Sequence, residues 1–122
     1  RLINSAVRTL ELEAGGIAAL SAALRDGLGS ALIAAVEKIR AASGRLIVTG
    51  MGKSGHVARK LAATFASTGT PAFFVHPSEA SHGDLGMITE NDAIVALSWS
   101  GETAELKNLT DYAKRFRISL IA

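Results

Sequence analysis

The chain has 122 residues, a length that fits one domain with one core. Apolar residues make up 48% and charged residues 20%, with 13 Lys and Arg against 11 Asp and Glu. The basic residues are scattered, so we expect no nucleic-acid partner, and the lack of cysteine excludes a disulfide framework and a thiolate metal site. The longest uncharged stretch, residues 61–78, is too polar for a membrane span, and we expect a cytoplasmic protein.

Residues 2–26 carry apolar side chains at alternating steps of four and three, which predicts a long helix with a narrow apolar seam. This helix either packs in a core or pairs with another subunit. Ser30 is expected to cap a second helix over residues 31–43, and Gly44 to end it. We therefore assign residues 1–43 to packing and oligomerisation, and residues 44–122 to an α/β domain.

Apolar strands and helical segments alternate after Gly44. The predicted strands are 46–48, 72–75, 93–97 and 118–121, and the segments between them are helices 54–67 and 103–116 and a helical turn at 78–82. Uniformly apolar strands are typical of a parallel sheet covered on both faces, so the fold class is a doubly wound three-layer α/β/α sandwich. A flavodoxin-like strand order, 2-1-3-4, would make strands one and three neighbours. The last strand has no covering helix after it, so we expect a domain truncated at its C-terminus.

A glycine loop follows the first strand. Residues Gly50–Gly55 match G-x-G-x-x-G, a pattern typical of a dinucleotide site, and the N–H groups of a helix start favour a phosphate. A ribose-binding acid is expected about 20 residues on, at the end of strand two. That strand instead ends at His76, and Glu79 comes only after a proline, so the dinucleotide site is the weaker alternative. A triphosphate loop would need glycine where Ile47 stands.

A hydroxyl-rich loop follows the third strand. Ser98, Ser100 and Thr103 flank Gly101 where a helix begins. One hydroxyl is enough to cap that helix, which is one interpretation. Three hydroxyls with helix N–H groups indicate a phosphate monoester site. In the 2-1-3-4 order this loop would face Gly52–Ser54 across one crevice.

Charged side chains beside that crevice suggest proton-transfer chemistry. A phosphate would raise the pKa of a carboxylate such as Glu102 or Glu105, as a general base for a carbon-bound proton requires. Lys53 would neutralise the phosphate or a developing enediolate oxygen. The alternatives are a favourable helix-dipole position for the acids and a solvated loop lysine.

Three further groups follow the second strand, and their roles stay open at this point. His76, His82 and Asp84 cluster there, but spacing alone does not make a metal site. A loop histidine is either a surface residue or a substrate contact. Trp99, between two serines, either walls the pocket or packs.

Four motifs in order resemble the sugar isomerase domain of D-arabinose 5-phosphate isomerases. They are VTGMGKSGH (48–56), FASTGTP (65–71), HPSEASHGDLGM (76–87) and SWSGETAE (98–105). The resemblance implies reversible aldose–ketose isomerisation of D-arabinose 5-phosphate and D-ribulose 5-phosphate through an enediol. It also implies a role in synthesis of the sugar acid Kdo for lipopolysaccharide, a homotetramer with shared active sites, and no required cofactor.

The same resemblance assigns roles to single residues by position. Two fall on catalytic positions, namely Lys53 and Glu105. The others fall on substrate-binding positions, namely Gly52, Ser54, Gly69, Thr70, His76, His82, Ser98, Ser100, Gly101 and Thr103, and His76 also falls on a position associated with inhibitory zinc.

The chain departs from the family pattern in two respects. Trp99 replaces a small or polar residue. A further catalytic Glu and His, and paired CBS domains, would lie beyond residue 122, so we expect this chain alone to be inactive. A non-catalytic phosphosugar-binding module is therefore the main alternative to an isomerase.

Overall fold

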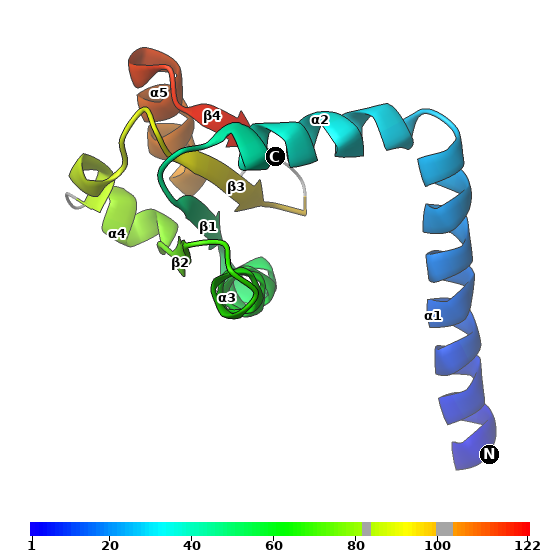
Figure 1. Cartoon of the computed structure of the whole chain (residues 1–122). Coiled ribbons are helices and arrows are strands. Elements are labelled where there is room, and N and C mark those ends of the chain that lie inside the picture. The colour runs from blue at the N-terminus through cyan, green and yellow to red at the C-terminus, as the bar shows by residue number, and fades with distance from the viewer. Residues whose placement is uncertain (82–83, 100–103) are drawn as a thin grey trace. The chain divides into compact units, whose positions relative to one another are not determined.

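The computed structural model describes residues 1–81, 84–99 and 104–122. The chain forms two compact units, residues 1–37 and 38–122 (Figure 1). The boundary expected from the sequence lay between residues 43 and 44. In the structure the boundary lies within the second helix, so the last residues of that helix belong with the α/β unit.

The first unit is helical. Helix α1 spans Leu2–Arg25, which confirms the predicted first helix, and α2 spans Leu28–Ala41. The expected cap at Ser30 is wrong, because α2 begins two residues earlier and the Ser30 hydroxyl donates to the Gly27 carbonyl at 3.0 Å from inside the helix. Among the described residues no single helix has the length and apolar composition to cross a membrane. Only α1 and α2 together meet those criteria, and they are bent by 81° at their break.

The second unit contains a parallel four-stranded sheet in the order β2-β1-β3-β4, which confirms the predicted strand order. Its elements are β1 Leu46–Gly50, α3 Gly52–Ser67, β2 Ala72–Phe74, α4 Pro77–Ser81, the 3-10 helix η1 Asp84–Met87, β3 Ala93–Leu97, the 3-10 helix η2 Ala104–Leu106, α5 Lys107–Phe116 and β4 Ser119–Ile121. The region expected to be loop at residues 84–92 thus contains a 3-10 turn. The last predicted helix is described as a 3-10 turn followed by α5.

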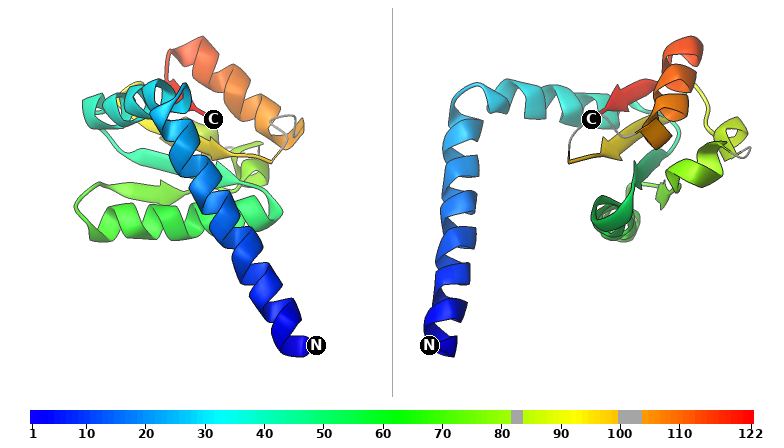
Figure 2. Two further views of the ribbon diagram at one scale, coloured as in Figure 1. Left: turned by 90° about the vertical axis from the view of Figure 1, so that its right-hand side faces the viewer. Right: turned by 180° about the vertical axis from the view of Figure 1, so that it is seen from behind.

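Helices cover both faces of the sheet (Figure 2), and alternating residues of the strands enter two separate cores. Leu46 and Val48 face α3, where Ala58 and Ala62 pack against them. Ile47 and Ile94 face α4 and α5, in a cluster with Leu109. The strands are largely apolar because both faces of the sheet are covered, and this confirms the three-layer α/β/α sandwich.

The amino edge of the sheet, where its strands begin, is held together by Asp92. This buried carboxylate accepts hydrogen bonds from the Arg45 N–H at 2.7 Å and the Thr89 N–H at 2.8 Å. A side chain at Gly44 would collide with Asp92, and the Gly44 N–H donates to the Asn91 carbonyl at 2.8 Å. Gly44 is therefore required for this close approach. Its expected role as the glycine that ends the second helix is wrong, since α2 ends at Ala41.

Candidate functional site

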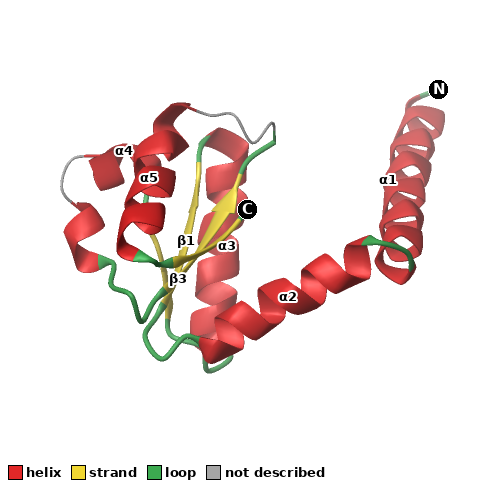
Figure 3. Cartoon of the chain, turned by 90° about the horizontal axis from the view of Figure 1, so that it is seen from above, coloured by secondary structure: helices red, strands yellow, loops and turns green. Residues whose placement is uncertain are grey.

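The carboxyl edge of the sheet, where its strands end, brings together the loops after β1 and β3. Gly50 pairs with Leu97, so the chain leaves both strands side by side (Figure 3). A Cβ at Gly50 would lie 2.9 Å from the Ser54 carbonyl and 3.0 Å from the Leu97 carbonyl. A Cβ at Gly55 would lie 2.7 Å from the Gly50 carbonyl. Glycine is thus needed at both positions because α3 begins directly against the two strand ends.

The turn between β1 and α3 has the geometry of an anion-binding helix start. Gly52 has φ +56°, in the left-handed region that favours glycine. Met51 is the N-cap residue of α3 and makes no side-chain capping hydrogen bond. The first N–H groups of this helix, at Gly52–Ser54, therefore lack the capping oxygen that a serine or aspartate would supply, and they can point at an anion.

A pocket of about 430 Å³ lies at this edge, and it is lined by Lys53, Ser54, Val57, Ala96, Leu97, Ser98, Trp99 and Ala122. It brings together three of the predicted site residues, Lys53 and Ser54 from the start of α3 and Ser98 from the segment after β3. Such a combination of one cation, two hydroxyls and a helix start suits a phosphorylated ligand.

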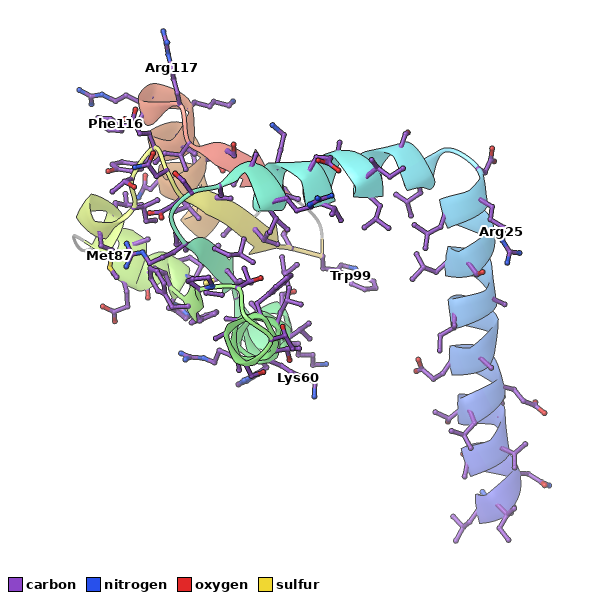
Figure 4. The ribbon with its side chains drawn as sticks, in the orientation of Figure 1. Arg25, Lys60, Met87, Trp99, Phe116 and Arg117 are labelled. Carbon is purple, nitrogen blue, oxygen red and sulfur yellow. The ribbon has the colours of Figure 1, made fainter. Side chains whose placement is uncertain are left out.

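Trp99 lines this pocket and is fully exposed, at 101% of its reference area. Figure 4 shows its side chain standing out from the ribbon beyond the end of β3. Of the two interpretations left open for Trp99, the structure supports a pocket wall and not packing within the core.

His76 follows β2 and immediately precedes α4. Its Nδ1 lies 3.1 Å from the Ser78 nitrogen and 2.7 Å from the Ser78 hydroxyl oxygen. Its ring meets Phe74 edge-on, with centroids 6.3 Å apart. The structure therefore places His76 at the carboxyl edge, with a local partner, Ser78, that the motifs did not indicate.

Gly69 and Thr70 lie at the amino edge, away from Lys53. They follow α3 and precede β2, and the carbonyl of the next residue, Pro71, accepts from the N–H of Leu46 at 2.8 Å. Leu46 begins β1 and Gly50 ends it, so about 13 Å of strand separates the two edges. Within one chain, Gly69 and Thr70 do not join the pocket of Lys53, and their binding role stays a prediction.

Several predicted residues lie outside the described part of the chain, namely His82, Ser100, Gly101 and Thr103. The backbone of Glu105 is in η2, which follows β3 and packs against α4 and α5. Its side chain is not among those described. The predicted roles of these five residues stay predictions.

Thr49 is a feature that the sequence did not single out. It is fully buried on β1 directly before the glycine loop, and its hydroxyl has no hydrogen-bond partner among the described residues. It stands two residues after Ile47, so it faces the α4 and α5 side of the sheet. An apolar strand with one threonine looks like an ordinary core strand, so the sequence did not indicate Thr49 as a candidate functional residue.

Residues 38–122 match the SIS domain. Arabinose 5-phosphate isomerase KdsD of Pseudomonas aeruginosa is 53% identical over 98% of this chain and 36% of its own length, so the chain spans about a third of that relative. Among solved structures, a protein of Escherichia coli CFT073 in complex with arabinose 5-phosphate is 38% identical, with a TM-score of 0.78 over 96% of this chain and 62% of that one.

A Bacteroides fragilis protein, assigned as a phosphosugar isomerase involved in capsule formation, is 39% identical. Its TM-score is 0.82 over 98% of this chain and 62% of that one. The sheet, the glycine loop and the match over residues 38–122 agree. The chain belongs to the SIS domain family.

Proposed function

We propose that this chain is the sugar-phosphate-binding part of an aldose–ketose isomerase that interconverts D-arabinose 5-phosphate and D-ribulose 5-phosphate. The observation that carries the proposal is the pocket at the carboxyl edge, where Lys53, Ser54 and Ser98 meet beside the start of α3. The 53% identity to an arabinose 5-phosphate isomerase supports this substrate. The neighbouring structure solved with arabinose 5-phosphate supports the same class of ligand.

In the proposed chemistry, the residues after β1 and the residues after β3 have different roles. The hydroxyls and helix N–H groups bind the phosphate and orient the sugar. Glu105 removes the proton from the carbon beside the carbonyl and returns it to the former carbonyl carbon, while the hydroxyl proton of the first of these carbons moves to the oxygen of the other. Lys53 stabilises the negative charge that develops on the enediolate oxygen. Lys53 lies at the start of α3, which follows β1, and the backbone of Glu105 lies in η2, which follows β3.

The test uses the full-length protein with D-arabinose 5-phosphate and follows the formation of D-ribulose 5-phosphate. Glu105→Gln and Lys53→Met should each lower kcat by about 10²-fold or more. Glu90→Gln and Lys60→Met are matched controls on exposed residues outside the pocket, and they should keep wild-type turnover. Undiminished turnover in Glu105→Gln would refute the role of Glu105. Tight sugar-phosphate binding without turnover in the wild type would instead support a phosphosugar sensor.

The finer assignments are part of the same proposal. We place the enzyme in the cytoplasm, in the synthesis of Kdo for lipopolysaccharide, and as a homotetramer whose contacts include the apolar seam of α1. In that seam Ile3 and Leu10 are 77% and 69% exposed. Light scattering of the full-length protein would measure the mass of the assembly. We also propose catalysis without a cofactor, so dialysis against EDTA should leave turnover unchanged.

A further inference from the structure

The feature that carries a further inference is the contact between His76 and Ser78. Helix α4 begins at Pro77, which has no N–H group, so the first backbone donor of this helix belongs to Ser78. The Nδ1 atom of His76 lies 3.1 Å from that Ser78 nitrogen. His76 therefore caps α4 with its imidazole, in the position where a serine or aspartate oxygen usually stands.

This contact decides which ring nitrogen carries the proton. The Ser78 hydroxyl, 2.7 Å from Nδ1, can donate or accept, but the Ser78 backbone N–H can only donate. Both contacts are satisfied together only when Nδ1 is an acceptor. In the neutral imidazole the proton then sits on Nε2, which becomes a hydrogen-bond donor.

The surroundings of the ring hold this arrangement in place. Phe74 contacts the imidazole edge-on, with an interplanar angle of 64°. The N–H of Val75 donates to the Val48 carbonyl at 3.0 Å, which ties the backbone before His76 to β1. Pro77, the next residue in the chain, is fully buried. These contacts favour the orientation of the half-buried imidazole in which Nδ1 faces Ser78 and Nε2 faces away from it.

The same geometry does not fit the zinc that the resemblance places at His76. A metal-bound histidine normally donates its second ring N–H to a carboxylate, a carbonyl or water. Here the second nitrogen faces the Ser78 N–H, which is itself a donor. Moreover, no three His, Cys, Asp or Glu residues come together anywhere in the described ranges.

We propose that Ser78 is a positioning residue that holds His76 as a neutral Nε2–H donor to an oxygen of the bound sugar, and that disfavours metal binding at this histidine. The sugar as acceptor rests on the isomerase function proposed above. The tautomer and the low metal affinity do not rest on it, because they follow from the contact with Ser78 alone.

The first experiment reads the tautomer directly in the full-length protein without substrate. The nitrogen spectrum of histidine-labelled protein, with the His76 signals assigned by their loss in His76→Gln, should show an unprotonated Nδ1 and a protonated Nε2.

Ser78→Ala removes the hydroxyl and keeps the backbone donor, so it should raise zinc affinity about two- to tenfold, the effect of one hydrogen bond. Ser78→Thr should restore the wild-type value. Ser67→Ala, at the far end of α3, is the matched control and should change neither reading.

The second experiment separates the two nitrogens by substitution. The amide N–H of glutamine can replace the Nε2–H of histidine, whereas the oxygen of asparagine can replace the Nδ1 acceptor that caps α4. His76→Gln should therefore keep more turnover than His76→Asn, and His76→Asn should keep more stability to urea than His76→Gln.

The outcomes also separate this inference from the proposed function. A proton on Nδ1, or zinc affinity unchanged in Ser78→Ala, would overturn the positioning role of Ser78 whatever the substrate is. Equal turnover of the glutamine and asparagine variants would overturn the donor role of His76. The expected tautomer in a protein that does not convert arabinose 5-phosphate would refute the isomerase and leave the Ser78 contact established.

Discussion

Gly50→Ala is the substitution whose effect the structure predicts most directly. The added methyl group would lie 2.9 Å from the Ser54 carbonyl carbon and oxygen and 3.0 Å from the Leu97 carbonyl oxygen. Ordinary contacts of a Cβ atom begin at 3.4 Å, so the overlap is about 0.4–0.5 Å on two sides. All three atoms belong to the backbone, so no side-chain rotation can relieve the overlap. The start of α3 must move away from the strand ends.

The expected cost follows from this overlap. Overpacking of a close contact typically lowers the free energy of unfolding by about 1–3 kcal/mol. A displacement approaching 1 Å of groups that bind substrate can lower the rate by about 10²-fold. We therefore expect Gly50→Ala to lower the urea midpoint of the full-length protein. It should also lower kcat/KM for arabinose 5-phosphate by about 10- to 100-fold.

Two other glycines supply controls that separate overlap from backbone strain. Gly52→Ala meets no atom within 4 Å but keeps φ at +56°, so it should cost about 1–2 kcal/mol of strain without moving α3. Gly15→Ala, in the middle of α1, also meets no atom and should stabilise that helix by about 1 kcal/mol. A Gly50→Ala protein with the urea midpoint and kcat/KM of the wild type would refute the close approach of α3 to the strands.

Three further predictions concern other parts of the α/β unit. Asp92→Ala leaves the N–H groups of Arg45 and Thr89 without an acceptor and should lower the free energy of unfolding by about 2–5 kcal/mol in urea, whereas Asp92→Asn should recover part of it. Trp99, the single tryptophan, should be quenched by acrylamide as readily as a free indole, and arabinose 5-phosphate should protect it; a shielded indole in the free protein would contradict its exposure. A hydrogen bond to Asp111 and the charge of Asp111 raise the pKa of Lys107 above its ordinary 10.5. The small stabilising effect of this ion pair is therefore present below pH 10.5 and is lost as pH rises through the raised pKa. The difference in urea midpoint between wild type and Lys107→Met should shrink in that range and not at neutral pH.

The sheet could be predicted because its determinants are local. Apolar runs such as Leu46–Val48 are flanked by glycines and by helical periodicity, and a parallel sheet is the usual arrangement of such alternation. The contact between Arg45 and Asp92 could not be predicted, because these partners are 47 positions apart. The left-handed conformation of Arg117 could not be predicted either. Arg117 ends α5 with φ 55°, at a position where glycine is usual.

The candidate site was predictable to the extent that it depends on strand order. Once β1 and β3 are neighbours, the loops that carry Lys53 and Ser98 must meet at the carboxyl edge. The position of Thr70 could have been inferred by the same rule, because a residue between a helix and the next parallel strand lies at the amino edge. The contact of Ser78 with His76 could not be inferred from the sequence, because it depends on the rotamer of the His76 imidazole.

The separation of Lys53 from Thr70 bears on how a complete site would be built. Within one chain about 13 Å of β1 lies between the two edges, so a single sugar phosphate held by the helix start at Lys53 does not reach Thr70. If both residues contact the same substrate, Thr70 must come from a second copy of the chain. The proposed oligomer and the proposed substrate-binding role of Thr70 are therefore one hypothesis. If the protein is a monomer in solution, Thr70 has no role in that site, whereas the pocket formed by Lys53, Ser54 and Ser98 is unaffected because a single chain supplies all three residues.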